Sequence, residues 1–283
     1  MDIKNNPMSA HPFKHILLAT EHTEFDIGAE RLALTMARLC GVPLQAVLPI
    51  LSNPEYEVEA PQLALRAEHE AAAKIAELRS QAREAGVELE IGARHGSEPY
   101  REIVDEATRL GSDLIVVRRR GKQGFLARLL VGEMVSKVVS HAPCSVLFVP
   151  RAAQMWSRGV LVAVDGSISA GQVAKVAAAI AAQCALPLTI VSIASHDTQA
   201  LRAEAERILD RALAIAAASG ANAQGRVLAG KPFEQILASV KTFQADLIVI
   251  GRHGESNVIR APLGGTAQKV VGLADSPVLV VHE

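Results

Sequence analysis

The amino-acid sequence contains two similar copies of one long segment, and this repeat constrains the fold more than any other feature. The stretch SDLIVVRRRG from Ser112 matches ADLIVIGRHG from Ala245, and SEPYREIV from Ser97 matches GKPFEQIL from Gly230 at the same offset. HILLAT, near the start, matches GVLVAV at a longer offset, so the first copy holds extra residues, within PILSNPEYEVEAPQ. Solenoid repeats are only about 20 to 50 residues long. Each copy is therefore predicted to be a whole domain.

The repeat also defines the expected domain boundaries. We expect an N-terminal tail over residues 1–13, a first domain over 14–150, a linker over 151–158 and a second domain over 159–283. The length of 283 residues fits two domains of ordinary size.

Each copy alternates short apolar runs with helical stretches. In the second copy the runs are GVLVAV, LPLTIVSI, QGRVLA, DLIVIG and SPVLVV. Such continuous apolar runs are typical of parallel strands whose two faces are both covered by helices. We therefore predict an α/β protein of two repeated doubly wound domains, each a five-stranded parallel sheet with helices on both faces. Sheets of this kind bind ligands at the carboxyl ends of their strands, at the topological switch point.

A glycine-rich stretch, GRHGESNVIRAPLGGT, directly follows the fourth strand of the second copy. Gly251 and Gly254 permit a sharp turn that presents backbone N–H groups, and Arg252 and His253 lie between them. His253 could contact a phosphate or a base, or it could simply be an exposed loop histidine. The stretch is a candidate ligand loop.

The same stretch ends at the start of a predicted helix. Gly264, Gly265 and Thr266 open this helix, whose unpaired N–H groups and positive dipole end suit a phosphate. Asp165 ends the first strand of this copy and could accept hydrogen bonds from a ribose or an amine. Together these features indicate a nucleotide pocket; a glycine-rich surface loop followed by a capped helix is the alternative.

Both copies resemble the universal stress protein family. The start VAVDGS, the strand and loop ADLIVIGRHG and the end SPVLVV carry the resemblance, which extends from Lys14 to Val281. The chain is thus identified as a tandem member with two such domains. The resemblance implies an adenine nucleotide alpha-hydrolase-like fold, a part in the stress response, and ATP, ADP or AMP as ligand. Magnesium would accompany a triphosphate.

The nucleotide-binding members of that family carry Gly, two residues, Gly, nine residues, Gly, and then Ser or Thr. Gly251, Gly254 and Gly264 match this spacing. Gly265 stands where the family has a hydroxyl residue, and Thr266 follows one position later. The resemblance therefore implies that these residues contact the phosphates, with a departure at Gly265.

The resemblance also implies the contacts of the nucleoside. Ala163, Val164 and Asp165 correspond to residues that flank the adenosine, and Ile193 corresponds to a residue that lines the base pocket. No catalytic residue and no metal ligand is assigned.

The first copy departs from this pattern. Arg118 replaces the first loop glycine, Glu21 replaces the aspartate, and Glu133 replaces a glycine at the helix start. A carboxylate at the helix start would repel phosphates. We therefore predict that the second domain binds nucleotide and that the first does not bind it in the same manner.

Composition excludes several other classes of protein. The formal net charge of -1 and an aromatic content of 3% argue against nucleic-acid binding. No uncharged apolar run reaches about 18 residues, which argues against a membrane span. Three cysteines without a CxxC pattern, and an N-terminus without an apolar signal region, favour a cytoplasmic location.

Three functional hypotheses follow. The first is a regulatory protein that binds an adenine nucleotide. The second is a scaffold without nucleotide, acting through an intramolecular pseudo-dimer in which SVLFV pairs with SPVLVV. The third is a slow ATPase, although no general base is evident and enzymatic activity is left open. Further association of tandem chains into a homodimer is also left open.

Overall fold

A computed structural model describes residues 13–52, 61–119, 133–254 and 263–282 of the chain. Their contacts form two compact units. One unit comprises Lys14–Met155 and Ile250–Glu283, and the other is built around Trp156–Val249. The end of the second copy therefore packs with the first copy.

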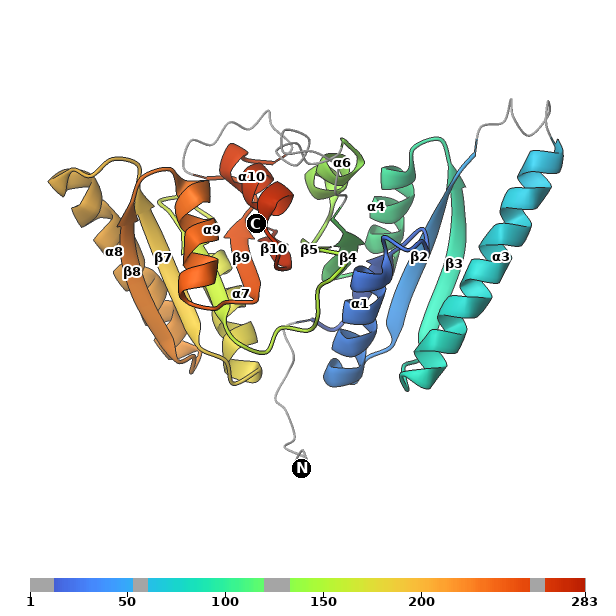
Figure 1. Cartoon of the computed structure of the whole chain (residues 1–283), viewed down its shortest axis with the longest axis horizontal. Coiled ribbons are helices and arrows are strands. Elements are labelled where there is room, and N and C mark those ends of the chain that lie inside the picture. The colour runs from blue at the N-terminus through green and yellow to red at the C-terminus, as the bar shows by residue number, and fades with distance from the viewer. Residues whose placement is uncertain (1–12, 53–60, 120–132, 255–262, 283) are drawn as a thin grey trace. The chain divides into compact units, whose positions relative to one another are not determined.

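The first copy alternates strands with helices along the chain (Figure 1). Its elements are β1 (Ile16–Ala19), α1 (Ile27–Cys40), β2 (Leu44–Leu51), α3 (Pro61–Glu84), β3 (Leu89–Gly96), α4 (Pro99–Leu110), β4 (Leu114–Arg118), α6 (Glu133–His141) and β5 (Ser145–Val149).

The second copy repeats this alternation. Its elements are β6 (Val160–Val164), α7 (Ala170–Gln183), β7 (Leu188–Ala194), α8 (Gln199–Ala218), β8 (Ala223–Ala229), α9 (Pro232–Thr242), β9 (Leu247–Gly251), α10 (Gly265–Leu273) and β10 (Val278–Val281). Pro232 opens α9, where its missing N–H costs nothing.

The strand order confirms the predicted doubly wound α/β fold. In the first copy the order is β3-β2-β1-β4-β5, and all these neighbours are parallel. In the second copy the order is β8-β7-β6-β9, and all these neighbours are again parallel. β10 pairs antiparallel with β5, with Val278 opposite Phe148 and Val280 opposite Val146. The predicted pairing of SVLFV with SPVLVV is thus confirmed.

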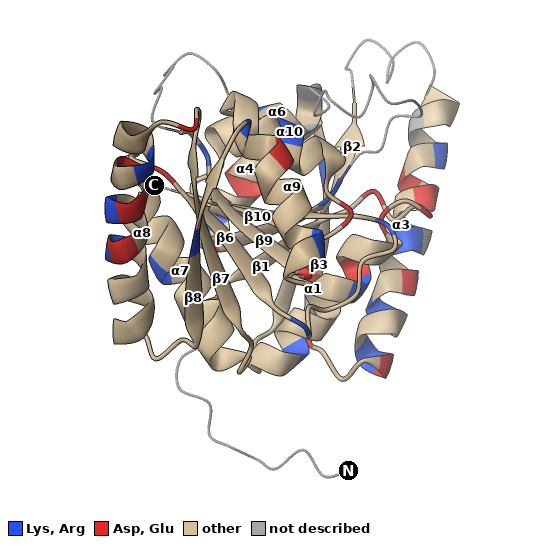
Figure 2. Cartoon of the chain, turned by 60° about the vertical axis from the view of Figure 1, so that its left-hand side comes forward, with Lys and Arg blue, Asp and Glu red and all other residues tan. Residues whose placement is uncertain are grey.

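Helices cover both faces of the first sheet. Right-handed crossovers place α1 and α3 on one face and α4 and α6 on the other. The rings of Tyr100 on α4 and His141 on α6 lie 5.4 Å apart. The central strands β1 and β4 are apolar along nearly their whole length, and Ile16, Leu17 and Leu18 of β1 are fully buried. Figure 2 shows the consequence, because charged residues colour the helices α3 and α8 while the strands are largely tan.

This topology fixes where a ligand site can form. β1 has neighbours reached by crossovers in opposite directions, so the switch point of the first copy lies at the carboxyl ends of β1 and β4. The corresponding strands of the second copy are β6 and β9, which pair with Val162 opposite Val249. The candidate residues Asp165 and Gly251 stand at the ends of these two strands. Among the described residues, no helix is long and apolar enough to cross a membrane.

Candidate functional site

The nucleoside-contacting residues predicted in the second copy meet at one edge of the sheet. Ala163 and Val164 end β6, and Asp165 follows at once. β6 and β7 run in parallel with Val164 opposite Ser192, so Ile193 lies beside Asp165. An Asp165 carboxylate oxygen accepts a hydrogen bond from the backbone N–H of Ser167 at 3.0 Å, which fixes its direction.

The two glycine segments of the candidate phosphate loop also meet. The N–H of Gly264, the N-cap of α10, donates to the carbonyl oxygen of Arg252 at 2.9 Å. A Cβ on Gly264 would lie 3.2 Å from that oxygen and 3.3 Å from the Cα of His253. A side chain on Gly264 would therefore force the start of α10 and the loop after Gly251 apart by a few tenths of an ångström. Pro262 lies outside the described residues, as do the first-copy glycines Gly121 and Gly132.

The first turn of α10 is open to solvent. Gly265 and Thr266 are its first two residues, and both are exposed. A Cβ on Gly265 would meet no atom within 4 Å. The first N–H groups of a helix have no acceptor within the helix, and such groups suit a phosphate.

The side chain of Arg252 points elsewhere. Its Nη2 donates to the carbonyl oxygen of Ser140 in the last turn of α6. Arg119, its counterpart in the first copy, donates to the carbonyl oxygens of Gly272 and Ala274 at the end of α10. Each arginine thus supplies a positive charge to the negative end of a helix dipole. The sequence did not reveal this reciprocal capping, because the partners are far apart along the chain.

The switch point of the first copy is filled by an ionic cluster. Arg118 Nη2 lies 2.6 Å from Glu21 Oε2, and its Nη1 lies 3.2 Å from Asp26 Oδ2. Nη1 also donates to Thr23 Oγ1 at 2.9 Å. The hollow left beside this cluster measures only about 20 Å³, and Pro49, the counterpart of Ile193, lines it. Ligand pockets usually measure about 300–1,000 Å³.

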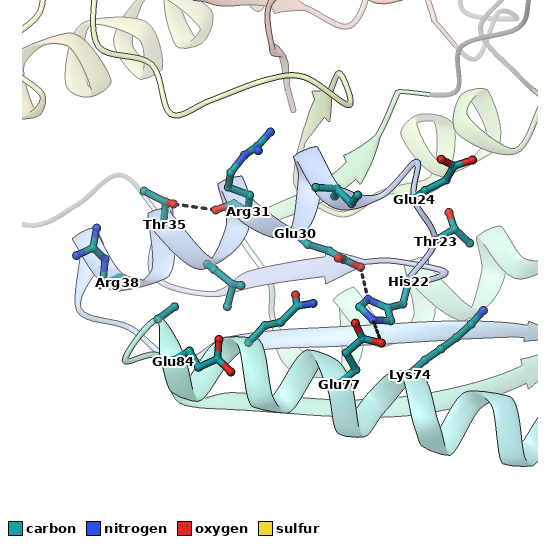
Figure 3. A pocket seen from close by; sticks show the side chains of 14 residues that line it. His22, Thr23, Glu24, Glu30, Arg31, Thr35, Arg38, Lys74, Glu77 and Glu84 are labelled. Atoms are coloured by element: carbon teal, nitrogen blue, oxygen red, sulfur yellow. Dashed lines mark hydrogen bonds and ion pairs between the residues drawn. The ribbon is translucent and has the colours of Figure 1, made fainter.

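A second cluster is centred on His22, which lies in the loop that follows β1 (Figure 3). His22 Nδ1 is 2.9 Å from Glu30 Oε1, and Nε2 is 3.3 Å from Glu77 Oε2. Thr20 Oγ1 donates to the same Glu30 oxygen at 2.6 Å. Burial lowers the pKa of His22, but the hydrogen bonds and charges of Glu30 and Glu77 outweigh it and leave that pKa raised. His22 therefore links the loop after β1 to both α1 and α3.

The His22 cluster stands at one end of a groove between α1 and α3, which encloses about 880 Å³. The sequence analysis did not find this groove. Its signal in the sequence is polar substitution on α3, where Lys74 and Gln81 stand at positions that α8 fills with isoleucine. Among the described residues, no three His, Cys, Asp or Glu side chains gather as a metal site.

Comparison with known proteins shows where this architecture occurs. The model of the family described as "Universal stress protein family" matches residues 12–150 and 157–282. A universal stress protein of Synechocystis is 28% identical over 171 residues, which are 59% of this chain and 57% of that protein. The chain thus spans little more than half the length of that relative. One from Methanocaldococcus jannaschii is 32% identical over 145 residues, 49% of this chain and 83% of the relative.

Solved structures share the fold along 95% of the chain. A universal stress protein from Archaeoglobus fulgidus superimposes with a TM-score of 0.75 at 19% identity, covering 95% of this chain and 96% of that one. A putative universal stress protein from Pseudomonas aeruginosa gives a TM-score of 0.69 at 21% identity, covering 95% and 93%. These likenesses concern the fold.

Proposed function

Since the chain belongs to the universal stress protein family, we propose that it is a stress-response regulatory protein whose second domain binds ATP or a related adenine nucleotide. The observation that carries the proposal is the contrast between the two copies at one position. The first copy has Arg118 at the end of β4, held by two carboxylates, and the second has Gly251 at the end of β9. A glycine at this position gives the second copy the backbone freedom that a phosphate loop needs.

The residues of the second domain suit the parts of such a ligand. Asp165 carries a carboxylate that can accept hydrogen bonds from ribose hydroxyls, and Ile193 offers an aliphatic surface for the base. The first turn of α10 offers N–H groups to the phosphates, with Gly264 allowing close approach and Thr266 adding a hydroxyl. A triphosphate would bring its own magnesium ion.

We propose that the first domain does not bind a nucleotide in this manner. Its cluster of Arg118, Glu21 and Asp26 satisfies its own charges within the protein. A nucleotide would have to displace Arg118, and Asp26 is 1% exposed, so its charge would lose a partner while buried. One nucleotide per chain is therefore expected.

The test is to purify the protein, denature it, and identify released small molecules by chromatography and mass spectrometry. One adenine nucleotide per chain supports a single site, and two would refute the asymmetry. If none is released, titration calorimetry with ATP and magnesium decides. Absence of binding there would leave the scaffold built on the β5–β10 pairing as the working hypothesis.

A bulky substitution in the loop can test the proposed pocket without disturbing the fold. Gly254→Leu should abolish nucleotide affinity while the melting temperature stays near that of the wild type, because Gly254 lies in the loop rather than in the core. Unchanged affinity in this variant would place the nucleotide elsewhere.

A further inference from the structure

The imidazole ring of His22 is held between carboxylates from two different helices (Figure 3). Its Nδ1 lies 2.9 Å from Glu30 Oε1 on α1, and its Nε2 lies 3.3 Å from Glu77 Oε2 on α3. The ring therefore joins the loop after β1 to both helices, at one end of the groove that lies between them. The proposed nucleotide site of the second copy uses none of these residues.

Both contacts of the ring are hydrogen bonds only while the ring carries two protons. An imidazolium donates from both nitrogens, whereas a neutral imidazole has one N–H group and one lone pair. An ionised carboxylate only accepts hydrogen bonds, so the lone pair of a neutral ring repels the carboxylate that faces it. The positions of the two glutamates therefore favour the protonated ring.

The two glutamates differ in how freely they can leave the ring. The side chain of Glu30 is 5% exposed, and its Oε1 also accepts a hydrogen bond from Thr20 Oγ1 at 2.6 Å. The side chain of Glu77 is 66% exposed, so it can turn into solvent. A buried carboxylate without a donor costs more free energy than an exposed one. A neutral ring therefore keeps its N–H on Nδ1, toward Glu30, and loses its contact with Glu77.

The backbone of His22 is also held in an unusual conformation. Its φ is 48°, in the left-handed region that residues other than glycine seldom adopt. Its N–H donates to Thr20 Oγ1 at 2.8 Å, so the same threonine contacts both the backbone of His22 and Glu30. Backbone that surrounding contacts keep in a rare conformation is frequent in switch regions. Loss of a ring contact removes one of the interactions that hold this loop.

The second copy folds without the His22 network. At the positions that correspond to the histidine and the two glutamates it has Gly166, Ala174 and Arg211. The fold therefore does not require the network, which is a property of the first copy alone.

The loop and the elements around it carry other ionisable groups, which have partners of their own. These groups are Glu21, Glu24 and Asp26 of the loop, Arg31 of α1, Lys74 of α3 and Arg118 of β4. The three loop carboxylates pair with Arg118 or Arg151. Arg31 and Lys74 donate to backbone carbonyl oxygens. Burial lowers the pKa of His22, but Glu30 and Glu77 outweigh it and leave that pKa raised.

We propose that His22 is a pH-sensitive latch between α1 and α3. With the ring protonated the latch is closed, and α3 is held to the loop after β1. Transfer of the Nε2 proton to solvent breaks the contact with Glu77 and opens the end of the groove beside His22. Leu78 and Ala82 of α3 are fully buried, so the helix stays on the sheet and the movement is local. The proposal does not depend on nucleotide binding.

The test measures amide hydrogen exchange of the full-length protein by mass spectrometry, at about pH 6 and about pH 9. Rates are corrected for the intrinsic effect of pH on exchange. Peptides that cover residues 70–80 of α3 should then exchange about fivefold faster at the higher pH, because local opening exposes their N–H groups. Peptides from α8 should show no such change, since the second copy lacks the latch.

A substitution of Glu77 separates the latch from a general effect of pH. The amide of Glu77→Gln accepts from a protonated Nε2 and donates to a neutral one, so this variant should keep α3 slow to exchange at both pH values. Glu77→Ala should exchange fast at both. Glu68→Gln is the matched control, because Glu68 is also on α3 and contacts His95 Nε2 at 3.0 Å. It should keep the response of the wild type.

Nitrogen NMR of the histidine rings reports the latch directly. The His22 signals are assigned by their loss in His22→Gln, and above the pKa of this ring they should show the Nδ1–H tautomer. Three results would overturn the proposal. They are exchange of α3 that follows the intrinsic effect of pH alone, a wild-type pH response in Glu77→Gln, and an Nε2–H tautomer of the neutral ring.

Discussion

Arg118 Nη2 and Glu21 Oε2 lie 2.6 Å apart across the carboxyl ends of β4 and β1. The same guanidinium reaches Asp26, which is 1% exposed. This contact uses the switch point of the first copy for an internal ion pair. The ion pair therefore occupies, in the first copy, the position that corresponds to the proposed site of the second copy.

Removing that guanidinium should destabilise the protein. In Arg118→Ala the buried Asp26 carboxylate keeps its hydrogen bonds from Thr23 but loses its cation. Breaking one side of a buried pair costs several kcal/mol, and we expect about 3 kcal/mol here by urea denaturation. Arg66→Ala is the control, because its pair with Glu70 is exposed and should contribute less than about 0.5 kcal/mol. Similar losses in the two variants would contradict the structural role of Arg118.

His22 should make stability depend on pH. Its folded-state pKa is raised above the ordinary value by Glu30 and Glu77, which outweigh burial. Its contribution is therefore fully present below the unfolded pKa of about 6.5, and it is lost as pH rises through the raised folded value. Urea denaturation from about pH 5 to about pH 9 should show wild type losing stability relative to His22→Gln over that range. A difference that stays constant with pH would refute the link.

Restoring the missing hydroxyl should strengthen nucleotide binding. Gly265→Ser places a hydroxyl where the first turn of α10 is open, since a Cβ there meets no atom within 4 Å. One added hydrogen bond contributes about 1 kcal/mol, so calorimetry with ATP and magnesium should show roughly fivefold tighter binding. Gly265→Ala is the matched control and should not change affinity. Equal affinity of the serine and alanine variants would show that the hydroxyl makes no contact.

Gly264 should not tolerate the same substitution. A Cβ at this position would lie 3.2 Å from the carbonyl oxygen of Arg252, so Gly264→Ala must push α10 away from the loop. We expect weaker nucleotide binding, measured in the same titration, with little loss of overall stability. Wild-type affinity in this variant would show that the close approach is not needed.

Arg119 and Arg252 should matter for stability and not for the nucleotide. Each arginine donates to carbonyl oxygens at the end of a helix contributed by the other copy. Charge-assisted hydrogen bonds are worth about 1.5–3 kcal/mol, so Arg119→Ala and Arg252→Ala should lower unfolding free energy by similar amounts. Nucleotide affinity should stay unchanged in both. Loss of nucleotide affinity in Arg252→Ala, without the same loss in Arg119→Ala, would show that Arg252 contacts the nucleotide.

The sequence by itself determined the repeat, the order of strands and helices, the doubly wound fold and the start of α10 after Gly264. These features are local, because strand runs, helical spacing and helix-opening glycines depend on residues close together in the chain. It also placed Asp165 and Gly251 at strand ends. Only the tertiary structure decided that Arg252 reaches Ser140, that Arg118 binds Asp26, and that a groove lies between α1 and α3. Those contacts join residues far apart in the chain, so they depend on how side chains of different elements fill the same space.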